Sequence, residues 1–108
     1  MGLDSYIRKS LISEFQESYE NHFESEVMIH WRNYRELHNW IKAKFSYLNK
    51  NLDNLNIKLS SQDLRELRIF YKKNLDTGVY EDDLMILSYC ILESEDDKDY
   101  VYYYSSWV

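Results

Sequence analysis

The stretch that decides the fold is Tyr-Val-Tyr-Tyr-Tyr-Ser-Ser-Trp-Val, residues 100–108, at the end of the sequence. A free chain end gains nothing from large apolar side chains and risks sticking to other molecules. Val, Tyr and Trp also favour the pleated surface of a sheet. We therefore predict a strand over residues 100–107 that is paired inside the folded protein.

The opposite end of the sequence offers a neighbour for this strand. Residues 2–8 alternate with a period of two, which predicts a strand. One side of it carries Leu3, Ser5 and Ile7, and the other carries Asp4, Tyr6 and Arg8. Pairing of the two segments would close the domain and hold both ends, although the sequence does not decide between parallel and antiparallel pairing.

Three segments have apolar residues at three- and four-residue intervals, which predicts amphipathic helices over residues 10–23, 32–48 and 60–75. The stripe of the first is Leu11, Ile12, Phe15, Tyr19 and Phe23. The second is the clearest, and its stripe is Tyr34, Leu37, His38, Ile41, Phe45 and Leu48. In the third, Ser60 or Ser61 is the predicted N-cap, and Leu64, Leu67, Phe70, Tyr71 and Leu75 face inward.

A fourth helix is predicted to begin at Glu81, Asp82 and Asp83, because the positive end of a helix dipole favours acidic side chains. The following residues 84–92 are apolar nearly all round the helix, so we expect this helix to be central or to lie under a partner subunit. Residues 93–99 are predicted to form an acidic loop.

Shorter signals complete the predicted order of elements. Residues 26–31 and 57–59 are predicted strands, and the asparagine-rich residues 49–56 are a predicted loop. The chain contains no proline and only two glycines, so no flexible linker divides it. We expect one domain over residues 1–108 with an α+β fold: a small sheet built largely from the N- and C-terminal strands, with three or four helices packed on one face.

The composition narrows the classes of function. The net charge is −6 and no cluster of Lys and Arg could follow a phosphate backbone, so direct binding to nucleic acid is not expected. A single cysteine, Cys90, excludes an internal disulfide and indicates a reducing, cytoplasmic setting. No apolar run is long enough to predict a membrane span.

The histidines do not predict a metal site, and no cofactor is expected. His22, His30 and His38 are spaced eight residues apart, which matches neither a helical metal pair nor a zinc finger. His38 lies on the apolar stripe of its helix, where a core histidine bonded to a tyrosine, a carboxylate or a backbone carbonyl is the usual arrangement.

One cluster of residues could form a binding site. Trp31 and Arg32, with His38 and Trp40, could build a pocket, because Arg stacks on indole rings. The competing interpretation is a structural network in which Arg32 meets a carboxylate such as Asp4. Further candidate binding residues in the C-terminal strand are Tyr102, Tyr104 and Trp107.

An acidic rim is predicted from two runs of carboxylates. Its members are Glu81, Asp82, Asp83, Asp96 and Asp97. Such runs usually form solvated surface, but carboxylates spaced along one face could also imitate the phosphates of a nucleic acid.

Several quoted motifs together resemble a family. They are the opening Met-Gly-Leu-Asp-Ser-Tyr-Ile, Trp31-Arg32, the Leu-His-Asn-Trp of residues 37–40, the helix start at residues 60–67 and the closing Tyr-Tyr-Tyr-Ser-Ser-Trp. This order is similar to that of small proteins of bacteriophages and prophages that begin Met-Gly-Leu-Asp-Met-Tyr-Leu, carry Tyr-Trp-Arg-Lys and His-x-Trp, and end in a Tyr/Ser/Trp tail. The resemblance implies a phage-encoded cytoplasmic protein that acts on a host or defence protein.

This chain departs from that pattern in several places. Ser5, His30 and Arg35 stand where the pattern has Met, Tyr and Asn. Residues 75–80 also lack the longer aromatic, glycine-containing segment of the family, so a site built from that segment would be absent.

The sequence thus leads to one functional hypothesis and two alternatives. The first is a non-enzymatic protein that binds a bacterial host protein through exposed aromatic residues and an acidic rim. The alternatives are a small ligand-binding or catalytic module with a Trp/Arg/His pocket, and an acidic mimic of nucleic acid. Self-association through the last helix is compatible with all three.

Overall fold

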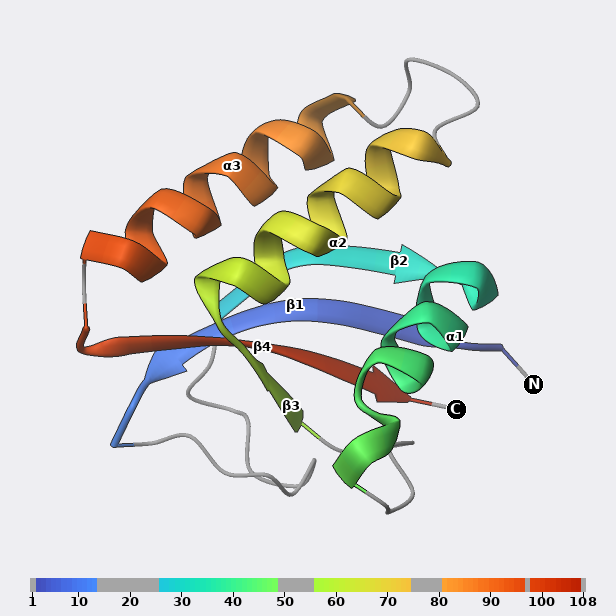
Figure 1. Ribbon diagram of the computed structural model, residues 1–108, viewed down its shortest axis with the longest axis horizontal. Coiled ribbons are helices and arrows are strands. Elements are labelled where there is room, and N and C mark those ends of the chain that lie inside the picture. Colours follow the sequence, from blue (N-terminus) through green and yellow to red (C-terminus); the bar gives the residue numbers. More distant parts are fainter. Residues whose placement is uncertain (1, 14–25, 49–55, 75–80, 97, 108) are drawn as a thin grey trace.

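A computed structural model describes residues 2–13, 26–48, 56–74, 81–96 and 98–107. These residues form an antiparallel sheet covered on one face by helices, which is the predicted α+β fold (Figure 1). The strands are β1 (Asp4–Leu11), β2 (Glu26–Arg32), β3 (Asn56–Leu59) and β4 (Tyr100–Trp107). The helices are α1 (Arg35–Lys44), the single 3₁₀ turn η1 (Ser46–Leu48), α2 (Ser61–Lys73) and α3 (Glu81–Asp96).

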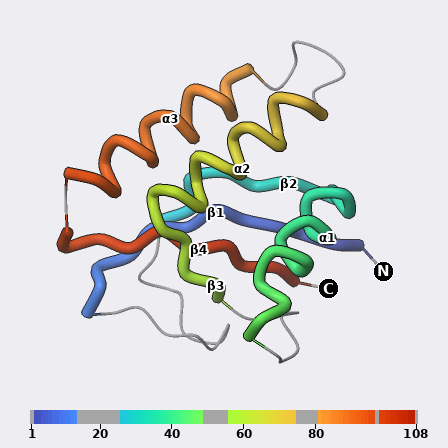
Figure 2. Tube along the Cα trace, viewed as in Figure 1, coloured from blue at the N-terminus to red at the C-terminus, as the bar shows by residue number. Residues whose placement is uncertain are grey.

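The two ends of the chain are the two central strands of the sheet. The strand order is β2-β1-β4-β3, and β1 pairs antiparallel with β4 along its whole length, from Asp4 opposite Trp107 to Leu11 opposite Tyr100. Figure 2 traces these two strands side by side through the middle of the molecule. The predicted pairing of the ends is confirmed, and its direction is antiparallel.

The tyrosine run is explained by the central place of β4. Every residue from Val101 to Ser106 is buried, so both faces of this strand are removed from solvent. Tyr102 and Tyr104 face the helices and belong to the main hydrophobic cluster. The prediction that these two tyrosines bind a partner is wrong, because they are core residues.

The predicted helix over residues 10–23 is wrong at its start. Ser10 and Leu11 continue β1, because β4 supplies backbone partners there, Val101 for Ser10 and Tyr100 for Leu11. The amide of Ile12 then donates to the carbonyl of Asp99 at 2.8 Å. Residues 14–23 of that predicted helix lie outside the described residues.

Helix α1 is shorter than its predicted span of residues 32–48. Arg32 belongs to β2. The backbone turns from strand to helix at Asn33, which has a left-handed φ of 56°. Asparagine tolerates this conformation better than most residues, and its Oδ1 accepts a 3.0 Å hydrogen bond from the amide of Leu3. At the other end, Leu48 is exposed, so the predicted stripe stops at Phe45.

Helix α2 begins as predicted, at a capping box. The Ser60 hydroxyl accepts from the amide of Asp63 at 3.1 Å, and the Asp63 carboxylate accepts from the amide of Ser60 at 2.9 Å. Leu64, Leu67 and Tyr71 of the predicted stripe are buried. The predicted strand before it is also confirmed, although it begins at Asn56, a residue assigned to the loop.

Helix α3 differs from its prediction in length and in burial. It continues to Asp96, so residues 93–96 are helical and the predicted acidic loop is wrong there. It buries Leu87, Cys90 and Ile91, but Met85, Tyr89 and Leu92 are exposed, so the helix covers the sheet and is not central. Among the described residues, no helix is long and apolar enough to cross a membrane.

A buried polar chain joins α1 to the sheet. Nδ1 of His38 lies 2.8 Å from the hydroxyl of Tyr104, and that hydroxyl donates to Oγ of Ser5 at 2.9 Å. All three residues are buried. The predicted core histidine is confirmed, with a tyrosine as its partner.

Candidate functional site: a cleft at the end of strand β2

A cleft of about 770 Å³ opens where the end of β2 meets three helices. The N-terminal side of α1, the C-terminal end of α2 and the first turn of α3 surround it. Ten residues line it: His30, Trp31, Arg32, Asn33, Tyr34, Glu36, Tyr71, Lys73, Asn74 and Asp83. Of the predicted cluster it therefore includes Trp31 and Arg32.

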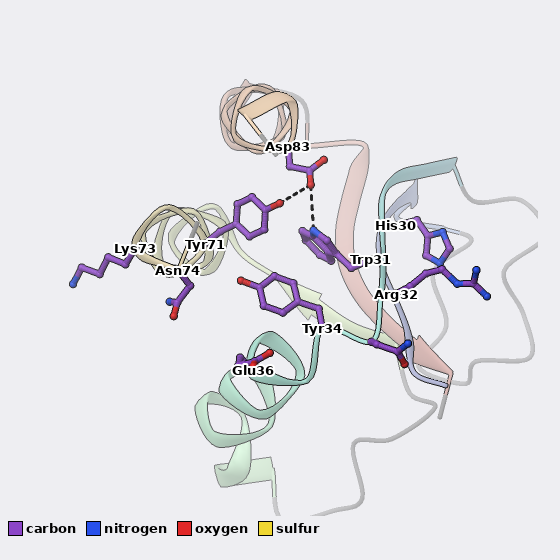
Figure 3. Close-up of a pocket in the computed structure, with 10 residues that line it drawn as sticks. His30, Trp31, Arg32, Tyr34, Glu36, Tyr71, Lys73, Asn74 and Asp83 are labelled. Atoms are coloured by element: carbon purple, nitrogen blue, oxygen red, sulfur yellow. Dashed lines mark hydrogen bonds between the residues drawn. The ribbon is translucent and has the colours of Figure 1, made fainter. Parts of the chain in front are cut away.

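Three aromatic rings form the inner wall of this β2-end cleft. The centroid of the Trp31 ring lies 5.6 Å from that of Tyr71 and 6.1 Å from that of Tyr34, and the two tyrosine centroids are 5.9 Å apart. Figure 3 shows both tyrosines turned toward Trp31, whereas Arg32 and Lys73 extend outward. Trp31 and Tyr71 are buried and Tyr34 is half-buried, so the rings provide a firm apolar wall.

Asp83 holds two of these rings in place. Its Oδ2 accepts from Nε1 of Trp31 at 3.2 Å and from the hydroxyl of Tyr71 at 2.7 Å. Burial and the hydrogen bond to Asp83 raise the pKa of Tyr71 well above its usual range, so the hydroxyl stays protonated and donates. Because Asp83 lies in the first turn of α3, this carboxylate also ties α3 to α2 and β2.

The rim of the cleft continues into a row of exposed side chains across three strands. Asp4 is paired with Arg32 on one side and with Trp107 on the other, so all three project from the face opposite the helices. Nε of Arg32 lies 3.6 Å from Oδ1 of Asp4, as the structural interpretation of Arg32 predicted. The Arg32 side chain is still 82% exposed, and Trp107 is 54% exposed.

Neighbouring residues extend this row along β1 and β2. Nε2 of His30 lies 3.0 Å from Oδ1 of Asp4, and the His30 ring stacks on Tyr6 with centroids 4.6 Å apart. The guanidinium of Arg8 also lies over the Tyr6 ring, 4.5 Å from its centroid. The surface beside the cleft is thus rich in aromatic rings and arginine, although the chain as a whole is acidic.

The other predicted binding residues lie elsewhere. His38 is on the helix-covered side of the sheet and Arg32 is on the opposite side, so the predicted Trp/Arg/His pocket does not assemble. Trp40 stacks on Phe70 between α1 and α2, with centroids 5.0 Å apart. The predicted cluster is therefore divided: His38 is buried in the core and Trp40 packs against it, whereas Trp31 and Arg32 line the separate cleft.

The predicted acidic rim is also divided. Glu81 and Asp82 are exposed at the start of α3, Asp83 lines the cleft, and Asp96 is exposed at the other end of the helix. Asp97 lies outside the described residues. The carboxylates gather at the two ends of α3, whereas a nucleic-acid mimic needs them at regular intervals along one face.

The electrostatic cluster around Glu93 was not predicted. Glu93, assigned to a loop from the sequence, points from α3 to the sheet, where it accepts hydrogen bonds from the Lys9 ammonium and from the hydroxyls of Tyr89 and Tyr102, the last at 2.5 Å. Burial opposes ionisation of Glu93, but these three donors outweigh it and lower its pKa to about 2. The four-residue spacing of Tyr89 and Glu93 on a helix was the available signal.

The neighbouring Cys90 is a buried free cysteine. Burial and the nearby Glu93 charge raise the pKa of its thiol to about 12, which leaves it without thiolate at neutral pH. Within the described ranges, no group of three His, Cys, Asp or Glu side chains is placed to hold a metal ion.

Comparisons with protein families, with curated proteins and with solved structures find no match for this chain. The function is therefore inferred from the residues of the cleft and its rim.

Proposed function

We propose that this chain is a non-enzymatic, phage-type interaction protein that binds a bacterial host or defence protein in the host-cell cytoplasm and modulates or inhibits it. The observation that carries the proposal is the row formed by exposed Arg32 and Trp107 on either side of Asp4, next to the aromatic cleft. Arg and Trp are the residue types that most often dominate the binding energy of protein interfaces.

The arrangement suits an interface in two respects. The Asp4 carboxylate holds the Arg32 side chain near the sheet while leaving most of it exposed, so less side-chain freedom is lost on binding. The cleft beside it has an apolar wall of rings and a charged rim with Arg32, Glu36 and Lys73, which resembles the division of interfaces into an apolar centre and a polar rim.

The test is quantitative affinity capture from bacterial lysate, followed by calorimetry with the purified partner. We expect the Arg32→Ala/Trp107→Ala variant to weaken binding by roughly 30-fold or more, because truncation of one central interface residue costs about 2 kcal/mol. The control variant Lys58→Ala/Tyr47→Ala changes exposed residues on β3 and beyond the far end of α1, and should bind normally. Failure to enrich any protein, or equal binding by both variants, would contradict the proposal.

A small-molecule ligand in the cleft is the second candidate, and the inner wall of three rings is the observation in its favour. Native mass spectrometry of protein purified from bacterial cells would then detect a bound molecule. That molecule should be lost in Tyr34→Ala and kept in Trp107→Ala, because Trp107 does not line the cleft. Protein binding through the row should instead be weakened in Trp107→Ala.

A further inference from the structure

An apolar stripe lies on the outer face of α3, away from the sheet. Met85 is 71% exposed, Tyr89 53% and Leu92 63%, and their spacing of four and three residues places them on one line along the helix. Exposed acidic side chains flank the stripe: Asp82 precedes it and Asp96 follows it. Three exposed large apolar residues in one line indicate a surface that is covered by another molecule.

The neighbouring outer face of α2 has the opposite charge. Its exposed side chains include Arg65 near the start and Lys72 near the end, with the exposed Ile69 between them. Helices α2 and α3 lie side by side and antiparallel on the sheet (Figure 1). One face of the molecule therefore carries a basic helix and an acidic, apolar helix next to each other.

Two intramolecular contacts show which residues lie at the same height along the two helices. Arg65 donates to Glu95 at 2.5 Å, so the start of α2 is level with the end of α3. The hydroxyl of Tyr71 donates to Asp83, so the end of α2 is level with the start of α3. Arg65 and Lys72 are thus each level with an acidic end of α3.

We propose that this face binds a second copy of the chain about a two-fold axis parallel to the two helices. Rotation about such an axis keeps the height along the helices and places α2 of the second copy over α3. Lys72 of one copy then faces Asp82 of the other, and Arg65 faces Asp96. Ile69 meets Met85 and Tyr89, so apolar contacts form the centre and four pairs of opposite charge form the rim.

The charges select this axis over the other face-to-face arrangement. The other face-to-face arrangement has a two-fold axis that also lies in the plane of the interface but is perpendicular to the helices. It would place α3 on α3 and α2 on α2 of the second copy. Asp82 would then face Asp96, and Lys72 would face Arg65, which brings like charges together at every corner. Like charges placed against each other cost an interface several kcal/mol, so the parallel axis is the one that the surface supports.

The first experiment measures the mass of the whole chain in solution by light scattering and sedimentation. We expect a mass about twice the 13.3 kDa of one chain. Leu92→Arg should reduce it to that of one chain while the thermal unfolding temperature measured at low protein concentration stays unchanged, because Leu92 is exposed. The control Tyr47→Arg, at an exposed site outside the face, should stay dimeric. A single-chain mass for the natural sequence at its highest soluble concentration would overturn the proposal.

Charge reversal tests the axis. Lys72→Glu and Asp82→Lys should each raise the dissociation constant at least about tenfold, and mixing the two variants should restore association, because each reversed residue then faces an opposite charge. With the perpendicular axis, either single reversal would instead strengthen the dimer. A strengthened dimer, or no restoration on mixing, would overturn the proposed geometry. None of these variants changes the β2-end cleft or the Arg32–Trp107 row, so the result is independent of the proposed function.

Discussion

Replacing Glu93 with Gln removes the carboxylate charge that Lys9, Tyr89 and Tyr102 contact. The Glu93 pKa of about 2 in the folded chain, compared with the ordinary 4.5, corresponds to about 3 kcal/mol of stability at neutral pH, since each pKa unit is about 1.4 kcal/mol. The side chains of Glu93 and Lys9 are only 17% and 16% exposed, so solvent screening reduces this value little. We expect Glu93→Gln to lower the free energy of unfolding by roughly 2 to 3 kcal/mol at pH 7.

The pH dependence follows from the direction of the shift. A carboxyl group with a depressed pKa stabilises the folded state when it is ionised in both states, which holds above the ordinary value of 4.5. The stabilisation of the folded state by Glu93 decreases as the pH drops from about 5. It is nearly lost near pH 2, where the Glu93 carboxylate of the folded chain also takes up a proton. The unfolding free energies of the natural chain and of Glu93→Gln should therefore converge across this range.

Urea unfolding followed by circular dichroism at a series of pH values measures this difference. Glu66→Gln is the matched control, because Glu66 pairs with Lys44 at 3.0 Å but is 42% exposed, and an exposed pair contributes at most about 1 kcal/mol. Its curve should run nearly parallel to that of the natural chain. If the Glu93→Gln curve also ran parallel from pH 7 to pH 2, the assignment of Glu93 as a stabilising buried carboxylate would be refuted.

Three further changes test other parts of the fold. Tyr104→Phe removes the hydroxyl between His38 and Ser5 and should cost about 1 to 3 kcal/mol, seen by calorimetry as a lower unfolding temperature, whereas Tyr47→Phe at an exposed ring should change nothing. Ser60→Ala breaks the capping box of α2 and should cost about 1 kcal/mol in equilibrium unfolding; no loss would contradict the cap. Cys90 should react with a thiol reagent at neutral pH only as fast as the chain unfolds, and a rapid reaction of the native protein would show that the thiol is accessible.

Local features of the fold were predictable because their causes are local in the sequence. The alternation around Ser5 predicted β1, and Ser60 followed three residues later by Asp63 predicted the start of α2. His38 was predicted to be a core residue from its place in the stripe of α1. Each of these features depends on a spacing of two, three or four residues, which neighbouring side chains set by themselves.

The predictions that were wrong depended on partners distant in the sequence. Ser10 and Leu11 extend β1 because β4 lies beside them, although the local sequence alone predicts a helix there. Glu93 lies in α3, where its carboxylate pairs with the ammonium of Lys9 in β1 and accepts a hydrogen bond from Tyr102 in β4. Such contacts override local propensity once the chain is folded.

The sequence by itself determined that both ends are built into an α+β domain, because period-two alternation and a run of large aromatic side chains are stable only in a paired, covered strand. Only the tertiary structure decided which aromatic and charged residues remain on the surface. It buried Tyr102, Tyr104 and His38 and left Arg32 and Trp107 exposed on either side of Asp4, because strand register and helix packing place residues from opposite ends of the chain against each other.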